Sequence, residues 1–80
     1  MAGRRAGSYS QGVRLLLLLE RLRMHRTYTP LDALAAELEV SPRQLRRDLR
    51  AIEEAQFEVD VDVVDGRAAV RLFGRLGEAR

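Results

Sequence analysis

Hydrophobic residues recur at helical spacing in three separate stretches of the chain. In each stretch they occupy one side of the helix that the spacing predicts, while polar and charged residues occupy the other. We therefore predict three amphipathic helices that pack around a common core. Their apolar stripes are Leu15, Leu18, Leu19 and Leu22 in the first helix, Leu31, Leu34, Ala35 and Leu38 in the second, and Leu45, Leu49 and Ile52 in the third.

Serine, threonine and proline mark where these helices begin. Ser10 is the predicted N-cap of the first helix, which runs to about residue 25. Thr29 is predicted to cap the second helix, with Pro30 at its first position and Asp32 as the acid of a capping box.

The third helix has its own start signal a few residues later. Ser41 is the predicted N-cap, Pro42 begins the helix, and Gln44 completes a capping box. Two start signals this close together predict two helices joined by a tight turn, which is a helix-turn-helix arrangement.

After Ile52 the apolar period changes from helical to two, as in a half-buried strand. Asp65-Gly66 is a strong signal for a two-residue hairpin turn, and a turn at that place fixes the register of the two strands. The fold class is therefore predicted as α+β: three helices followed by a two-stranded β-hairpin, the winged helix-turn-helix architecture. The predicted cross-strand pairs are Val64 with Arg67, Val63 with Ala68, Val61 with Val70, Asp60 with Arg71, and Val59 with Leu72.

A single small domain accounts for most of the 80 residues. Residues 1–9 are predicted to form a flexible basic arm, residues 10–73 the winged helix-turn-helix domain, and residues 74–80 a flexible tail. The initial methionine and the arginine-rich end suit a complete short protein. A domain cut from a longer regulator is the alternative.

Charge is unevenly distributed along the chain. Residues 1–50 contain ten arginines against five acidic residues, whereas residues 51–80 contain four arginines against seven acidic residues. All basic residues apart from the histidine are arginine, the side chain best suited to bidentate contacts with phosphate and guanine. Double-stranded DNA is therefore the partner that the composition favours.

The absence of cysteine excludes disulfides and the common zinc sites, and no metal or cofactor is expected. The leucine run at residues 15–19 is too short to cross a bilayer, and no cleavage site for a signal peptide follows it. No small-molecule effector is evident. We expect a cytoplasmic, nucleoid-associated protein.

The stretches RLLLLLERL and TPLDALAAELEVSPRQLRRDLRAIEEAQF, within residues 13–57, resemble the N-terminal DNA-binding domains of DeoR-type repressors and of WYL-domain bacterial regulators. The resemblance implies a bacterial transcription regulator, most simply a repressor. It differs at Gln44, where a threonine is common, and no effector domain follows. The residues that the resemblance assigns to the recognition helix are Ser41, Arg43, Arg46, Arg47 and Asp48.

A recognition helix lies in the major groove with its N-terminal residues against the base edges. On that arrangement Arg43, Gln44 and Arg47 are the predicted base readers, with Gln44 contacting adenine N6 and N7. Arg46 and Arg50, at the edges of the basic face, are predicted to contact phosphates. A solvated helix face is the alternative for the arginines, and a purely structural capping role is the alternative for Gln44.

Further DNA contacts are predicted outside the third helix. The free amides near Thr29 and Ser41 can bind anions, and Arg4 and Arg5 of the arm are candidates for an adjacent minor groove. The predicted hairpin carries three aspartates, with Arg67 near its tip. Either this wing stands away from DNA with Arg67 alone reaching it, or the ribbon serves another partner.

The first helix has apolar residues outside its core stripe. Val13, Leu17 and Met24 lie on the side away from that stripe, with Leu16 at its border. They form a candidate surface for a homodimer or another partner, unless neighbouring elements cover them.

Nothing in the sequence indicates catalysis, and no catalytic residue is predicted. His25 is the single histidine, at a predicted helix end, and no glycine-rich phosphate loop is present. The alternative to a DNA-binding regulator is a winged-helix interaction module, an adaptor or antirepressor acting through its apolar first helix or its acidic wing.

Overall fold

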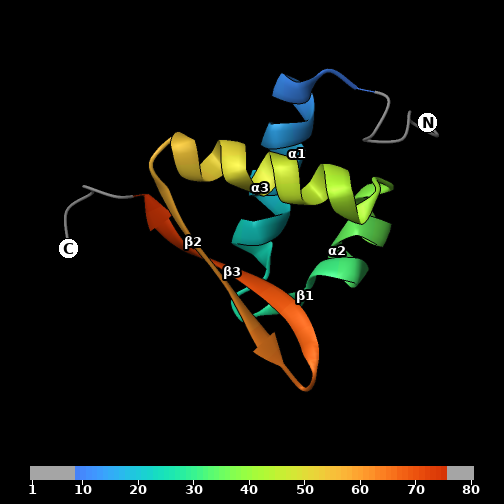
Figure 1. Ribbon diagram of the computed structural model, residues 1–80. Coiled ribbons are helices and arrows are strands. Elements are labelled where there is room, and N and C mark those ends of the chain that lie inside the picture. Colours follow the sequence, from blue (N-terminus) through green and yellow to red (C-terminus); the bar gives the residue numbers. More distant parts are fainter. Residues whose placement is uncertain (1–8, 76–80) are drawn as a thin grey trace.

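The computed structural model describes residues 9–75, which form three helices and a small antiparallel sheet. Helix α3 crosses in front of α1, α2 lies beside the N-terminal end of α3, and the hairpin extends below the helices (Figure 1). This is the predicted α+β winged helix. Arg4 and Arg5 lie outside the described residues. The elements are α1 Gln11–Met24, β1 Thr29–Pro30, α2 Leu31–Leu38, α3 Pro42–Glu54, β2 Phe57–Val64 and β3 Arg67–Arg75.

Two of the three predicted helix starts are confirmed. Ser10 caps α1, accepting a hydrogen bond from the amide of Val13 at 3.5 Å. Ser41 caps α3 in the same way, accepting from the amide of Gln44 at 3.0 Å, and Pro42 is the first helical residue. Since proline has no amide hydrogen to leave unpaired, it suits that position.

The predicted start of the second helix is wrong. The N-cap of α2 is Pro30, with no side-chain capping bond, and the helix begins at Leu31. Thr29 instead lies in the short strand β1 opposite Val70 of β3, with only 8% of its surface exposed. The backbone of Thr29 therefore pairs with β3, and Thr29 does not cap α2.

The core lies between the three helices and the inner face of β3. Each helix contributes buried leucines, and the sheet contributes one valine. Full burial of a leucine side chain stabilises the fold by about 1.5–3 kcal/mol, so these residues fix how α3 sits on α1 and α2. The largest fully buried side chains are Leu18, Leu22, Leu34, Leu45 and Val70.

The hairpin register is confirmed at every predicted pair, from Val64 opposite Arg67 to Val59 opposite Leu72. Asp65 and Gly66 both have positive φ, of 53° and 77°, as the predicted two-residue turn requires. The sheet order is β1-β3-β2, so β2 is an edge strand.

The two strands are less regular near the helices than near the turn. The pairing shifts between Glu58 and Val59, which face Gly74 and Leu72, so Phe73 is an extra residue in β3. Strand β3 then continues to Arg75, two residues beyond the predicted end of the domain.

The apolar face of the hairpin is covered only near its base. Val59 packs against the core, whereas Val61 and Val63 are 47% and 68% exposed. The predicted half-buried strand is thus confirmed only for its first half, because the hairpin extends past the helices that would cover the rest (Figure 1).

Candidate nucleic-acid interface

Helix α3 separates its arginines from its leucines as predicted. Leu45, Leu49 and Ile52 are at most 5% exposed and hold the helix to the core. On the opposite side the arginines are exposed, and none of them forms an ion pair with a residue in the range 9–75. This basic face can therefore accept an anionic partner without first breaking an internal contact. It consists of Arg43, Arg46, Arg47 and Arg50.

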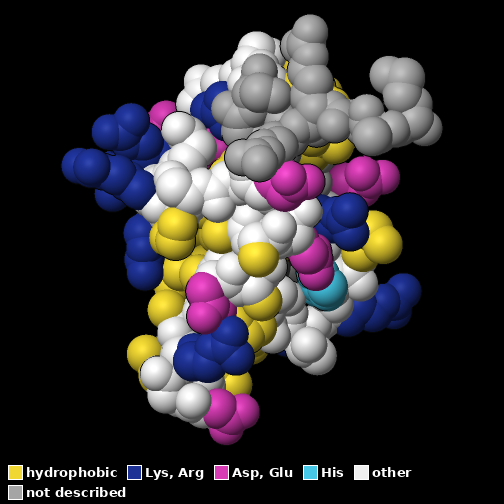
Figure 2. Space-filling model, turned by 90° about the vertical axis from the view of Figure 1, so that its right-hand side faces the viewer, with side chains coloured by type: hydrophobic (Ala, Val, Ile, Leu, Met, Phe, Trp, Pro, Cys, Tyr) yellow, Lys and Arg dark blue, Asp and Glu magenta, His cyan; other side chains and the backbone are white. Residues whose placement is uncertain are grey.

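The start of α3, the start of α2 and the wing tip meet at one place. Arg46, Arg67 and Asp32 line a shallow hollow of about 280 Å³ there. In the view of Figure 2, basic side chains gather at the upper left edge of the molecule, and a further basic side chain lies beside an acidic one lower down. The start of α3, the start of α2 and the wing tip thus lie next to one another. These are elements with which winged helices contact DNA.

Arg67 at the wing tip has an internal partner. Its Nη2 donates a hydrogen bond to Oδ1 of Asp32 at 2.6 Å. This hydrogen bond holds the pKa of Asp32 below its ordinary value. Both side chains are exposed, so the pair is a weak surface link, and Arg67 can exchange the carboxylate for another anion.

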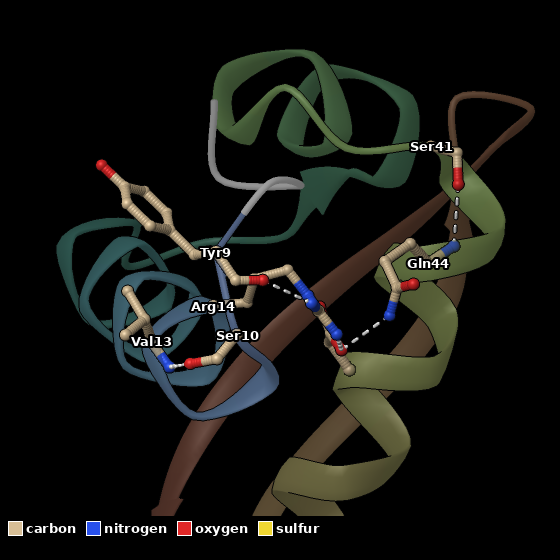
Figure 3. Close-up of polar contacts among 7 residues, drawn as sticks. Tyr9, Ser10, Val13, Arg14, Ser41 and Gln44 are labelled. Carbon is tan, nitrogen blue, oxygen red and sulfur yellow. Dashed lines mark hydrogen bonds and ion pairs between the residues drawn. The ribbon is translucent and has the colours of Figure 1, made fainter. Parts of the chain in front are cut away.

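Asp48 is the one charged residue on the buried side of α3, with only 4% of its side chain exposed. Arg14 of α1 grips it with two hydrogen bonds, Nε to Oδ2 at 3.0 Å and Nη2 to Oδ1 at 3.3 Å. Arg14 Nη1 also donates to the carbonyl oxygen of Tyr9 at 2.9 Å (Figure 3). The pair joins α1 to the centre of α3.

Gln44 belongs to the same network. Its Nε2 donates to Oδ1 of Asp48 at 3.0 Å, so it does not close the predicted capping box with Ser41 (Figure 3). A carboxylate that already pairs with Arg14 can only accept hydrogen bonds, and this fixes which end of the Gln44 amide faces inwards. The carbonyl oxygen of Gln44 and the second N–H of its amide are left for other contacts.

Sequence reasoning missed this network, although one signal was present. Asp48 lies three residues after Leu45 and four before Ile52, so a buried position follows from the helical period. Arg14 lies one turn before the buried Leu18 and shares its side of α1. A buried carboxylate needs a cation close to it, and Arg14 supplies this cation for Asp48.

Two of the three aspartates of the wing have local partners. Asp60 accepts a hydrogen bond from the Tyr28 hydroxyl at 2.7 Å, which raises the pKa of Tyr28 above its ordinary value. Asp62 accepts from the amide of Val63 at 2.8 Å. Neither carboxylate is part of the basic surface around α3.

The apolar surface of α1 differs from its prediction in one residue. Val13 and Met24 are 41% and 66% exposed, as expected for a partner surface. Leu17 was assigned to this surface wrongly, because it is partly buried and packs against the core. Leu16 is 70% exposed and takes its place.

Within residues 9–75 no group of three or more histidine, cysteine or acidic side chains is placed to hold a metal ion. His25 lies at the end of α1, with Nε2 3.4 Å from Oε1 of Glu37. Among the same residues no helix is long and apolar enough to cross a membrane.

Three helices with a tight turn before α3, followed by an antiparallel hairpin, define a winged helix-turn-helix domain. A family model described as an HTH domain matches residues 14–68, more than half of the chain. The chain therefore belongs to this helix-turn-helix family of DNA-binding domains. Comparisons with curated proteins and with solved structures give no significant match.

Proposed function

We propose that this protein is a sequence-specific transcription regulator, a repressor, that places α3 in the major groove of double-stranded DNA. The observation that carries the proposal is the face of four exposed arginines, held outwards by buried leucines on the other side of the same helix. The resemblance to DeoR-type and WYL-domain regulators supports the repressor role.

The position of each arginine along α3 suggests its role. Arg43 and Arg47 lie where base readers of recognition helices lie, and each can donate two hydrogen bonds to guanine O6 and N7. Arg46 and Arg50 suit phosphates on either side of the groove, with the backbone amide of Arg43 as an additional donor. Arg67 reaches a phosphate by exchanging Asp32 for it, so the wing adds one contact.

The network around Asp48 narrows the role of Gln44. A glutamine contacts adenine with both ends of its amide, donating to N7 and accepting from N6. Here one of the two N–H groups of the amide is already engaged by Asp48, so the nitrogen end of the amide faces inwards. We therefore expect Gln44 to accept a hydrogen bond from an exposed amino group, adenine N6 or cytosine N4, and to disfavour guanine and thymine at that position.

The test is to replace Arg46 and Arg47 together by alanine and to measure affinity for duplexes selected from a random pool. Removing two guanidinium groups that bind DNA predicts a fall of about 100-fold or more. The slope of log affinity against log salt should also flatten by about 0.9 for each phosphate that the variant no longer neutralises. The HSQC spectrum of the variant shows whether the domain is still folded.

The matched control removes the same charge elsewhere. Arg26→Ala/Arg75→Ala takes two exposed arginines from outside α3 and should change duplex affinity by no more than about threefold, as expected of charges that make no DNA contact. Equal decreases in the two double variants would mean that only overall charge matters. Unchanged binding by Arg46→Ala/Arg47→Ala would overturn the proposal.

A second function, as an adaptor or antirepressor that binds another protein, draws on the exposed apolar side chains of α1 and the wing. Leu16 and Val63 are 70% and 68% exposed. Amide shifts discriminate the two: a duplex should perturb residues 41–50 if the protein binds DNA, whereas a protein partner should perturb α1 or β2. Self-association of a DNA-binding regulator through α1 is compatible with the first function.

A further inference from the structure

A second basic site lies away from the α3 surface. The C-terminal end of α1 and the last residues of β3 enclose an open hollow of about 450 Å³. No residue of α2 or α3 lines this hollow. It is thus separate from the surface proposed to bind DNA.

The irregularity in β3 shapes one wall of the hollow. In a regular strand successive side chains point to opposite faces. The extra residue Phe73 interrupts this alternation, and the whole run from Arg71 to Arg75 borders the hollow. Bulges of this kind are over-represented where a strand presents side chains to a functional site.

The charge of the hollow is strongly positive. Arg23 and Arg26 approach from the end of α1, and Arg71 and Arg75 from β3. No carboxylate lines it. Of the acids near it, Glu37 contacts Arg21 and His25. Glu58 and Asp60 lie on the neighbouring strand β2, opposite Gly74 and Arg71, outside the lining of the hollow.

The two arginines of β3 are positioned by aromatic rings. The guanidinium carbon of Arg71 lies 4.6 Å from the ring centre of Phe73, and that of Arg75 lies 5.8 Å from the ring centre of Phe57. A cation held over a ring keeps its N–H groups free for an anion. None of the four arginines has an ion pair within the described part of the chain.

We propose that this hollow binds the phosphate or pyrophosphate group of a small ligand. Guanidinium groups match phosphate oxygens with paired hydrogen bonds, and several of them on one concave surface favour a multiply charged anion. The volume is that of a small-molecule site. Leu72 and the half-exposed ring of Phe73 provide an apolar wall for the rest of the ligand.

The experiment titrates the intact protein with inorganic phosphate, pyrophosphate, AMP and adenosine, and follows the amides of residues 71–75 and the arginine Nε–H signals by NMR. Pyrophosphate and AMP should shift these signals saturably, and adenosine should not. AMP binding more tightly than inorganic phosphate would show that the apolar wall contributes, whereas equal binding would restrict the site to the free anion.

Variants assign the shifts to the hollow. Arg26→Ala/Arg75→Ala should weaken pyrophosphate binding by about tenfold or more, whereas Arg46→Ala/Arg47→Ala should not change it. Arg26→Ala alone, which removes an exposed side chain outside the sheet, should weaken binding in the same direction if the double variant does not fold.

Two results would overturn the proposal. Shifts that grow linearly with pyrophosphate, or that appear equally in both double variants, would mean nonspecific attraction to a basic protein. Displacement of pyrophosphate by a saturating duplex, together with weaker duplex binding by Arg26→Ala/Arg75→Ala, would mean that the hollow contacts the DNA backbone.

Discussion

Asp48 occupies a position in α3 where a leucine would also fit the helical period. Taking a carboxylate and a guanidinium out of water costs free energy that their attraction only just offsets. We therefore expect the Arg14–Asp48 pair to specify how α3 packs on α1 rather than to add to the free energy of unfolding. It sets the rotation of α3 against α1 and orients Gln44, whereas leucines alone would tolerate a small rotation.

Replacing one partner of the Arg14–Asp48 pair should destabilise the protein strongly, whereas replacing both partners by apolar residues should not. Arg14→Met or Asp48→Asn leaves the other partner buried without its counter-charge, so we expect each to lower the free energy of unfolding by about 3 kcal/mol. Arg14→Met/Asp48→Leu should lie within about 1–2 kcal/mol of the unchanged protein. Urea denaturation of the three variants measures both effects.

The exposed carboxylate of Glu58 supplies the control, because Glu58→Gln should change stability by less than about 0.5 kcal/mol. If Asp48→Asn costs no more than this control, the pair does not hold α3. If the stable double variant also loses discrimination at one base position, the orienting role of Asp48 on Gln44 is supported.

At the scale of elements, the hairpin was predictable and β1 was not. A two-residue turn fixes the register of both strands, so Asp65-Gly66 determined every pair up to Leu72. A strand of two residues has no period to detect. Thr29-Pro30 is also a common helix start, and only pairing with the distant strand β3 makes it a strand. The bulge at Phe73 likewise depends on packing rather than on local pattern.

The hairpin turn should depend on Gly66. Its φ of 77° lies in the left-handed region, where any side chain adds strain although a Cβ would meet no neighbour. Gly66→Ala should therefore lower the free energy of unfolding by about 1 kcal/mol.

Gly12, in the first turn of α1, also has free space around it but no positive φ. Gly12→Ala should leave stability unchanged or raise it by up to about 0.5 kcal/mol. Thermal unfolding distinguishes the two, and equal effects would contradict the assignment of strain to the turn.

At the scale of the whole molecule, charge and apolar surface occupy different places. The basic face belongs to α3, and exposed apolar side chains belong to α1 and the wing. The helical period predicted the basic face and apolar residues outside the core stripe of α1, whereas the exposure of the wing valines was not predicted. It could not predict which apolar residues stay exposed. Leu16 and Leu17 are neighbours, and only the packing of α1 against the other elements decides that Leu17 is covered.

The exposed stripe of Val13, Leu16 and Met24 is best explained by a second copy of the chain. On the proposed function, one recognition helix with a wing that adds a single arginine gives a small DNA-binding surface. Helix-turn-helix dimers gain specificity by binding two half-sites about one helical turn apart. An apolar stripe on a helix outside the DNA surface is suited to an interface across a twofold axis. We therefore expect a dimer at micromolar concentration.

Leu16→Gln/Met24→Gln removes this stripe without burying a polar group, since both side chains are mainly exposed. The variant should sediment as a monomer, bind a single half-site with unchanged affinity, and bind a paired site about tenfold or more weakly, because the second half-site no longer binds in the same event. Val61→Gln/Val63→Gln removes a similar exposed surface from the wing and should remain dimeric. A monomeric unchanged protein would overturn the expected dimer. Dissociation caused only by the wing variant would remove α1 from the interface and assign it to the edge strand β2.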